Sequence, residues 1–196
     1  MEQFIGLDLS LSGTGFCRLD VNDRVPEFRV ETIKSEKKKF EDDLVRLRFI
    51  SDEVMRRIPK DANLVCVEDF FTPSNPYQIG AAIKLAMLAA IVRLGLKEAG
   101  IPFIIPTANQ IKKFVTGKGQ AQKNTVVMEV YKRWGLEAKD DNQADACGMA
   151  HLAKAIYDMQ YCRDLSGLTQ IQQKVAKTVL GDRPSYNCPW QRKMED

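Results

Sequence analysis

A carboxylate at the end of an apolar stretch near the start of the chain constrains the fold most. Residues 3–9 read Gln-Phe-Ile-Gly-Leu-Asp-Leu, and small residues follow as far as Gly15. This pattern predicts a buried strand that ends in a turn. Burial of Asp8 would cost several kcal/mol unless a cation or hydrogen-bond donors meet its charge. Two interpretations stay open: Asp8 is either a metal ligand or a cap for the glycine-containing turn.

A second apolar stretch also ends in an acid. Residues 64–67 read Leu-Val-Cys-Val, and Glu68 follows directly. Two neighbouring strands that each end in a carboxylate would place Asp8 and Glu68 side by side at one sheet edge. Like charges repel there unless a divalent cation lies between them. The two strands therefore predict two ligands for one ion site.

A third group of acids opens a helix rich in small residues, at residues 140–150. Asp141 and Asp145 are spaced i, i+4, and Asn142 and Asp145 are spaced i, i+3, so either pair shares one helical face. The helix dipole also favours acids in a first turn, which explains Asp140 and Asp141 without a metal. Capping does not explain Asp145, which lies one turn further inside.

Four motifs stand in order along the chain. These are Gly-Leu-Asp-Leu-Ser-Leu-Ser-Gly-Thr-Gly near the start, the strand that ends at Glu68, a basic loop at residues 113–123, and Gln-Ala-Asp-Ala at residues 143–146. Together they resemble the RuvC group of Holliday junction resolvases in the ribonuclease H-like superfamily, over about residues 3–157. The resemblance implies an α/β fold, with a mixed five-stranded sheet and helices on both faces. It also implies a crossover junction endodeoxyribonuclease that acts in DNA recombination and repair.

The acids and the resemblance together predict the metal site. Asp8, Glu68 and Asp145 would hold two Mg²⁺ ions, which Mn²⁺ can replace, because hard oxygen ligands favour these ions over zinc. One ion would lower the pKa of an attacking water, and the other would stabilise the leaving 3′-oxygen. Family members usually carry an acidic or histidine ligand three residues before the last aspartate. Asn142 stands at that position and Asp141 beside it, so the fourth ligand is left between these two residues.

The basic loop is the predicted phosphate-binding segment. Glycines separate its lysines and no acid interrupts them between Lys112 and Lys123, so ammonium and backbone N–H groups can meet phosphates together. We expect Lys112 and Lys118 to contact DNA. The resemblance gives Lys113 or Lys123 the role of stabilising charge on the reacting phosphate.

Two aromatic residues, Phe70 and Phe71, follow the second acid. Members of the similar family place an aromatic ring at the position of Phe71 against unpaired bases at the centre of the junction. A place in the hydrophobic core is the alternative for both rings.

A homodimer is the expected assembly, because a C2 dimer presents two equivalent active sites to a two-fold junction. The candidate interface is the helix expected over residues 77–96, and packing in the core alone is the alternative. Its apolar stripe consists of Ile79, Ala82, Ile83, Ala86, Ala90, Ile91 and Leu94, widened by Met87 and Leu88.

The pattern of apolar residues predicts the layout of a nuclease domain over residues 1–158, and a helical and basic extension follows at residues 159–196. Strands are expected at residues 3–9, 14–20, 27–33, 63–69 and 101–105. Helices are expected at residues 76–99, 108–115, 123–134 and 143–158. One more helix has the apolar stripe Phe40, Leu44, Leu47, Ser51, Val54 and Ile58.

Composition is consistent with this interpretation but would not have produced it. The 196 residues contain 44% hydrophobic residues and carry a net charge of +3, which is too small to indicate nucleic acid by itself. The five cysteines are widely spaced, and neither a signal peptide nor an apolar run near 18 residues is evident. We therefore expect no membrane partner and a location in the bacterial cytosol, or in the host cytosol if the gene belongs to a phage.

Two other classes of protein compete with the nuclease. Residues 6–15 also resemble the first phosphate loop of sugar kinases and actin-like ATPases, but those folds need two such domains and a second loop. A non-catalytic module that binds branched DNA is the third interpretation. The three acids argue against it, since a binding protein would gain from losing negative charge near phosphates.

Overall fold

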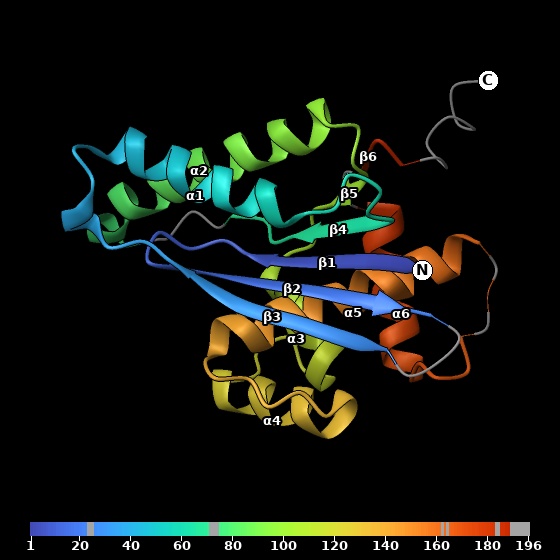
Figure 1. Ribbon diagram of the computed structural model, residues 1–196. Helices are drawn as coiled ribbons and strands as arrows, with labels where there is room; N and C mark the ends of the chain where they lie inside the picture. Colours follow the sequence, from blue (N-terminus) through green and yellow to red (C-terminus); the bar gives the residue numbers. More distant parts are fainter. Residues whose placement is uncertain (23–25, 71–74, 162, 164, 183–184, 189–196) are drawn as a thin grey trace.

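The computed structural model describes the chain except residues 23–25, 71–74, 162, 164, 183–184 and 189–196. A mixed sheet with the strand order β3-β2-β1-β4-β5-β6 forms its middle layer (Figure 1). The strands are β1 (Glu2–Asp8), β2 (Gly13–Val21), β3 (Glu27–Lys34), β4 (Leu64–Val67), β5 (Phe103–Ile104) and β6 (Ser185–Tyr186). The first three form the predicted antiparallel meander, whereas β4 and β5 run parallel to β1.

Helices cover both faces of this sheet, as Figure 1 shows. The helices α1 (Asp43–Arg57) and α2 (Ile79–Glu98) cover one face, and a short η2 turn (Pro76–Gln78) leads into α2. On the other face lie α3 (Ala108–Thr116), α4 (Lys123–Trp134), α5 (Asp141–Gln160) and α6 (Gln170–Asp182). The predicted α/β fold, with a mixed sheet and helices on both faces, is confirmed. The structure adds the two-residue β6, which pairs antiparallel with β5.

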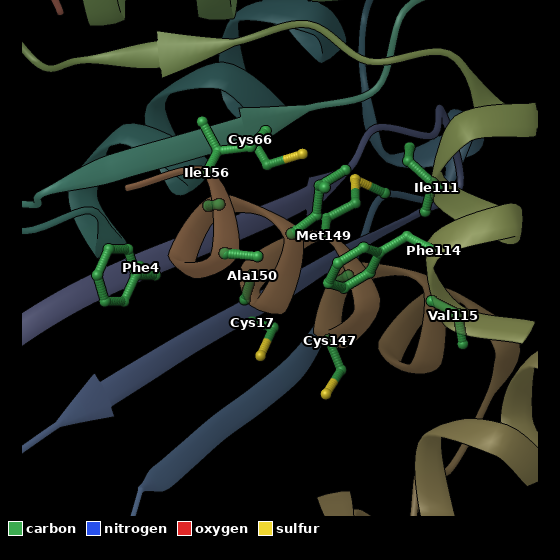
Figure 2. Packing of buried hydrophobic residues seen from close by; sticks show 14 of the residues in the cluster. Phe4, Cys17, Cys66, Ile111, Phe114, Val115, Cys147, Met149, Ala150 and Ile156 are labelled. Carbon is green, nitrogen blue, oxygen red and sulfur yellow. The ribbon is translucent and has the colours of Figure 1, made fainter. Parts of the chain in front are cut away.

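Two glycines let α5 lie directly on the centre of the sheet. A Cβ atom on Gly6 of β1 would stand 1.9 Å from the carbonyl oxygen of Ala146, and one on Gly15 of β2 would stand 2.1 Å from that of Asn142. Both distances are far below a van der Waals contact, so only glycine fits. Figure 2 shows the result: α5 lies against the strands near Phe4, with α3 beside it. The N-terminal half of α5 is thereby held close to the end of β1.

Helix α1 differs from its predicted apolar stripe at two positions. Leu44 is exposed, whereas Arg46 is buried. The Arg46 guanidinium donates hydrogen bonds to the Ser35 hydroxyl at 2.9 Å, to the Ser35 carbonyl at 2.7 Å, and to the carbonyl of Leu11. These acceptors offset the cost of burying the charge, and periodicity along one helix cannot reveal acceptors from a distant loop.

The C-terminal segment packs on the nuclease fold. Val175 and Val179 of α6 are buried in the same hydrophobic cluster as α3 and α5. The ring of Tyr186 in β6 stacks on Phe103 with centroids 4.7 Å apart. The functional division at residue 158 stays a prediction, although these residues share one core with the rest of the chain.

Helix α2 is more apolar than the sequence patterns indicated. Together with η2 it spans Pro76–Glu98, which is long and apolar enough to cross a membrane, with a mean hydropathy of 1.9 over an 18-residue window. The expectation that no such run exists is therefore wrong. Length and composition alone are weak evidence for a membrane span, because core helices share them. Ion pairs also tie α2 to the domain, with Lys84 Nζ 2.6 Å from Asp43 and Arg93 Nη2 3.3 Å from Asp69.

Candidate active site

Asp8 is the last residue of β1 and lies opposite Gly15 of β2. The turn that follows is closed by Ser10 and Thr14. The Thr14 hydroxyl donates to the Ser10 carbonyl at 2.9 Å, and the Ser10 N–H donates to that hydroxyl at 3.2 Å. Because this pair already closes the turn, the turn does not require Asp8 as a cap. The structure thus weakens the structural interpretation of this half-buried carboxylate.

Glu68 stands beside Asp8 because of strand register. Leu7 of β1 pairs with Val67 of β4 in parallel, so the next residue of each strand is a carboxylate. The backbone N–H of Glu68 continues the ladder by donating to the carbonyl of Leu7 at 3.5 Å. The two carboxylates therefore follow neighbouring strands at the same end of the sheet, as the two apolar stretches predict.

Asp145 enters the same region from the second turn of α5. Asp140 caps this helix, because its carboxylate accepts a hydrogen bond from the N–H of Gln143 at 2.9 Å. The other oxygen of Asp140 accepts from the Thr32 hydroxyl of β3 at 2.6 Å. The start of α5 is thus anchored to the sheet, and this anchoring fixes where Asp145 points.

These acids share a pocket of about 290 Å³. Its wall combines the end of the sheet with three helices. Six of the residues predicted for the site line it: Asp8, Glu68, Lys112, Lys123, Asn142 and Asp145. The remaining lining residues are Ser10, Ala108 and Ile111. Sequence reasoning missed Ser10, although its place two residues after Asp8 on the same turn could have indicated it.

Burial raises the pKa of all three acids, and repulsion by neighbouring carboxylates adds to it. Burial raises the pKa of Asp8 well above its usual value, and the charges of Glu68 and Asp145 raise it further. Burial, followed by the charge of Asp145, raises the pKa of Glu68 to about 7. Burial also raises the pKa of Asp145 to about 6, against the opposing effect of nearby lysines. A cation in the pocket would favour the charged form of each group.

The two candidates for the fourth ligand lie in different surroundings. Asn142 lines the pocket, whereas Asp141 forms an ion pair with Lys123 at its edge. The hydrogen bond from Lys123 lowers the pKa of Asp141, and the same bond raises the pKa of Lys123. Asn142 is thus a candidate because it lines the pocket, and Asp141 is a candidate because its carboxylate pairs with a lysine of the pocket wall.

Other predicted DNA contacts lie outside this pocket. Lys113 and Lys118 are exposed and are not part of the pocket wall. Phe70 is 45% exposed and lines a second pocket of about 220 Å³, which also touches Asp8 and Glu68. It is therefore not a core residue. Phe71 lies outside the described residues.

The donor atoms of the pocket suit hard divalent cations. Carboxylates of Asp8, Glu68 and Asp145 supply oxygen, and neither histidine nor cysteine lines the wall. Across the described residues, no three His, Cys, Asp or Glu side chains are close enough to enclose an ion by themselves. Magnesium commonly binds one or two carboxylates and completes its shell with water and substrate phosphates. The pocket therefore fits an ion shared between protein and substrate.

The sheet order, with acids at the ends of two central strands and on the helix that crosses them, fits the predicted ribonuclease H-like α/β fold. The family model described as "Crossover junction endodeoxyribonuclease RuvC" matches residues 4–153, and the chain belongs to this family.

Individual relatives support the assignment. The chain is 29% identical to the crossover junction endodeoxyribonuclease RuvC of Delftia acidovorans, over 92% of this chain and 98% of the relative. It is 28% identical to that of Gloeobacter violaceus, over 76% and 85% of the two chains. Among solved structures, Thermus thermophilus RuvC in complex with Holliday junction substrate superimposes with a TM-score of 0.65 at 22% identity, over 83% and 96% of the chains. This last match supports the fold.

Proposed function

We propose that this protein nicks Holliday junctions, and other branched DNA such as forks and flaps, by metal-dependent hydrolysis of the phosphodiester bond. The observation that carries the proposal is the pocket in which Asp8, Glu68 and Asp145 meet Lys112 and Lys123. Acids alone would repel DNA, and lysines alone would only bind it. Their combination in one pocket of a RuvC-family chain supports catalysis on a phosphate.

Asp8, Glu68 and Asp145 would hold the cations, with Mg²⁺ as the proposed ion. Dependence on divalent metal is general in this family. When bound, such ions polarise the phosphate and lower the pKa of an attacking water. The protein contributes rigid placement, because each acid comes from a strand end or a helix that the core fixes.

The lysines of the pocket would neutralise the DNA backbone at the reaction centre. Lys112 belongs to α3 and Lys123 opens α4, so the connection that carries Lys118 joins two of the pocket's walls. Lys113 and Lys118 are free to reach phosphates further along the DNA, since both side chains are exposed. Phe70, which lines the second pocket, would contact a base, and the same role is proposed for Phe71.

A homodimer with α2 at its interface completes the proposal. Large apolar side chains on this helix face solvent, among them Tyr77 just before it at 97% exposure, and Ile83 and Leu94 at 55% each. Ile79 and Met87 are also exposed. An exposed apolar face on a helix that also packs on α1 fits an interface between two copies of this chain.

The cytosol is the proposed location. Cys17, Cys66 and Cys147 are buried free thiols, which is typical of a reducing compartment.

A nicking assay with Mg²⁺ tests the function. We expect symmetric nicks in a four-way junction, weaker cleavage of forks and flaps, and little cleavage of duplex DNA. Binding without nicks would favour the non-catalytic module. ATP hydrolysis without nicks would favour the kinase or actin-like alternative.

A further inference from the structure

We propose that Arg93 of α2 is a positioning residue that fixes the segment Glu68–Phe70 at the edge of the active site. The proposal rests on the proposed function and adds to it a residue outside the acids and the basic loop. Arg93 would act through its neighbours, by setting where the Glu68 carboxylate and the Phe70 ring stand.

Arg93 contacts three consecutive residues of this segment. Its Nη2 donates to the backbone carbonyl of Glu68 at 3.0 Å and to the carboxylate of Asp69 at 3.3 Å. Its guanidinium carbon lies 5.9 Å from the centre of the Phe70 ring, within the range of a cation–π contact. One side chain thus touches the segment that carries both a proposed metal ligand and a proposed base contact.

The backbone of the segment is also held from the side of the sheet. The N–H of Glu68 donates to the carbonyl of Leu7 at 3.5 Å, a long hydrogen bond, and the N–H of Asp69 donates to the carbonyl of Pro106 at 2.8 Å. Strand β4 itself ends at Val67. Arg93 therefore provides the contact from the helical side, just where the regular ladder has ended.

Stability does not account well for this arginine. Its Nε atom is buried and has no hydrogen-bond partner among the described residues, which leaves a costly donor unsatisfied. The other ion pair of α2, between Lys84 and Asp43, ties the helix to α1 with side chains that are more exposed. A charge that is imperfectly paired beside an active site fits a role in placing the site.

Arginine suits this role because its planar fork can bind a carbonyl and a carboxylate while its face lies over a ring. Lysine keeps the charge, but it is a point donor without a stacking face. Arg93→Lys should therefore hold the segment less well than wild type but better than Arg93→Met.

The experiment compares Arg93→Met and Arg93→Lys with the control Lys84→Met, which removes the other ion pair of the same helix. The first readout is the single-turnover nicking rate at saturating junction concentration. The affinity for the junction is measured separately, without metal. We expect Arg93→Met to slow nicking by about 10- to 100-fold, because misplacement of a ligand by about 1 Å has effects of this size. Affinity should change by less than about threefold, and Lys84→Met should leave both quantities near wild type.

The second readout needs no activity. Thermal unfolding with increasing Mg²⁺, in the absence of DNA, gives the ion concentration for half-maximal stabilisation. Loss of a residue that orients a ligand should raise this Mg²⁺ concentration by about 10-fold in Arg93→Met and by less in Arg93→Lys. An unchanged Mg²⁺ requirement in Arg93→Met, or an equal change in Lys84→Met, would overturn the proposal. If the wild-type protein nicks no substrate, the proposed function fails, while this readout still decides the role of Arg93.

Discussion

Replacement of Glu68 by glutamine should stabilise the metal-free protein at neutral pH. The pKa of Glu68 rises from 4.5 to about 7 in the fold, mainly because of burial and then because of the charge of Asp145. Glu68 therefore contributes its full stability below pH 4.5 and loses it as the pH rises through 7. The rise corresponds to about 3 kcal/mol, since one pKa unit equals about 1.4 kcal/mol. Water at the open pocket screens the charge, so this figure is an upper limit.

The assay is thermal unfolding of wild type and Glu68→Gln between pH 4 and pH 8, first in EDTA and then in Mg²⁺. Near pH 4 the midpoints should nearly coincide. At pH 8 the variant should unfold up to about 6 to 12 °C higher, because each kcal/mol shifts a domain of this size by about 2 to 4 °C. Mg²⁺ should reduce this difference in unfolding midpoint, because it stabilises the wild type more than the variant. A difference that stays constant with pH, or a less stable variant at pH 8, would refute the reasoning.

The remaining predictions concern the basic loop, the contact between helix and sheet, and the fourth ligand. Lys118→Ala should weaken binding to all DNA alike, and salt titrations should show that the dependence of its affinity on salt falls by about one phosphate contact. Lys123→Ala should lower the nicking rate in single-turnover assays more than it lowers the affinity. Gly6→Ala should cost more than about 3 kcal/mol in urea unfolding because its Cβ would meet the backbone of α5, while Gly80→Ala, with open space, should not destabilise. Asp141→Ala should raise the Mg²⁺ concentration for half-maximal cleavage if Asp141 is a ligand, and an unchanged requirement would assign the role to Asn142 or water.

The acids were predictable because the end of a strand and the spacing along a helix are local properties. An apolar stretch fixes where a strand ends, so the carboxylates of Asp8 and Glu68 had to meet once β1 and β4 paired. Asp145 was predictable because it lies too far inside α5 to be a capping residue. Gly6 stands in the first motif, but its close approach to Ala146 became evident only when α5 was placed.

The unpredicted features depend on partners that are distant in sequence. From the sequence alone Arg46 would be assigned to the surface, because its hydrogen-bond acceptors, the carbonyls of Ser35 and Leu11, come together only in the fold. In the sequence Arg93 only interrupts an apolar helix, and its contact with the residue that follows β4 becomes evident only in the fold. Periodicity and charge pattern do not reveal such contacts, because each describes one element and does not extend to another.

The central claim is that the half-buried carboxylates of the pocket perform the chemistry. Its most direct test measures nicking and binding of one four-way junction by wild type and Asp8→Asn, with and without Mg²⁺. We expect the wild type to nick the junction only with the ion. The variant should bind the junction equally well or more tightly, because one charge that repels phosphate is gone, yet produce no nicks. Nicking by Asp8→Asn at the wild-type rate would contradict the account.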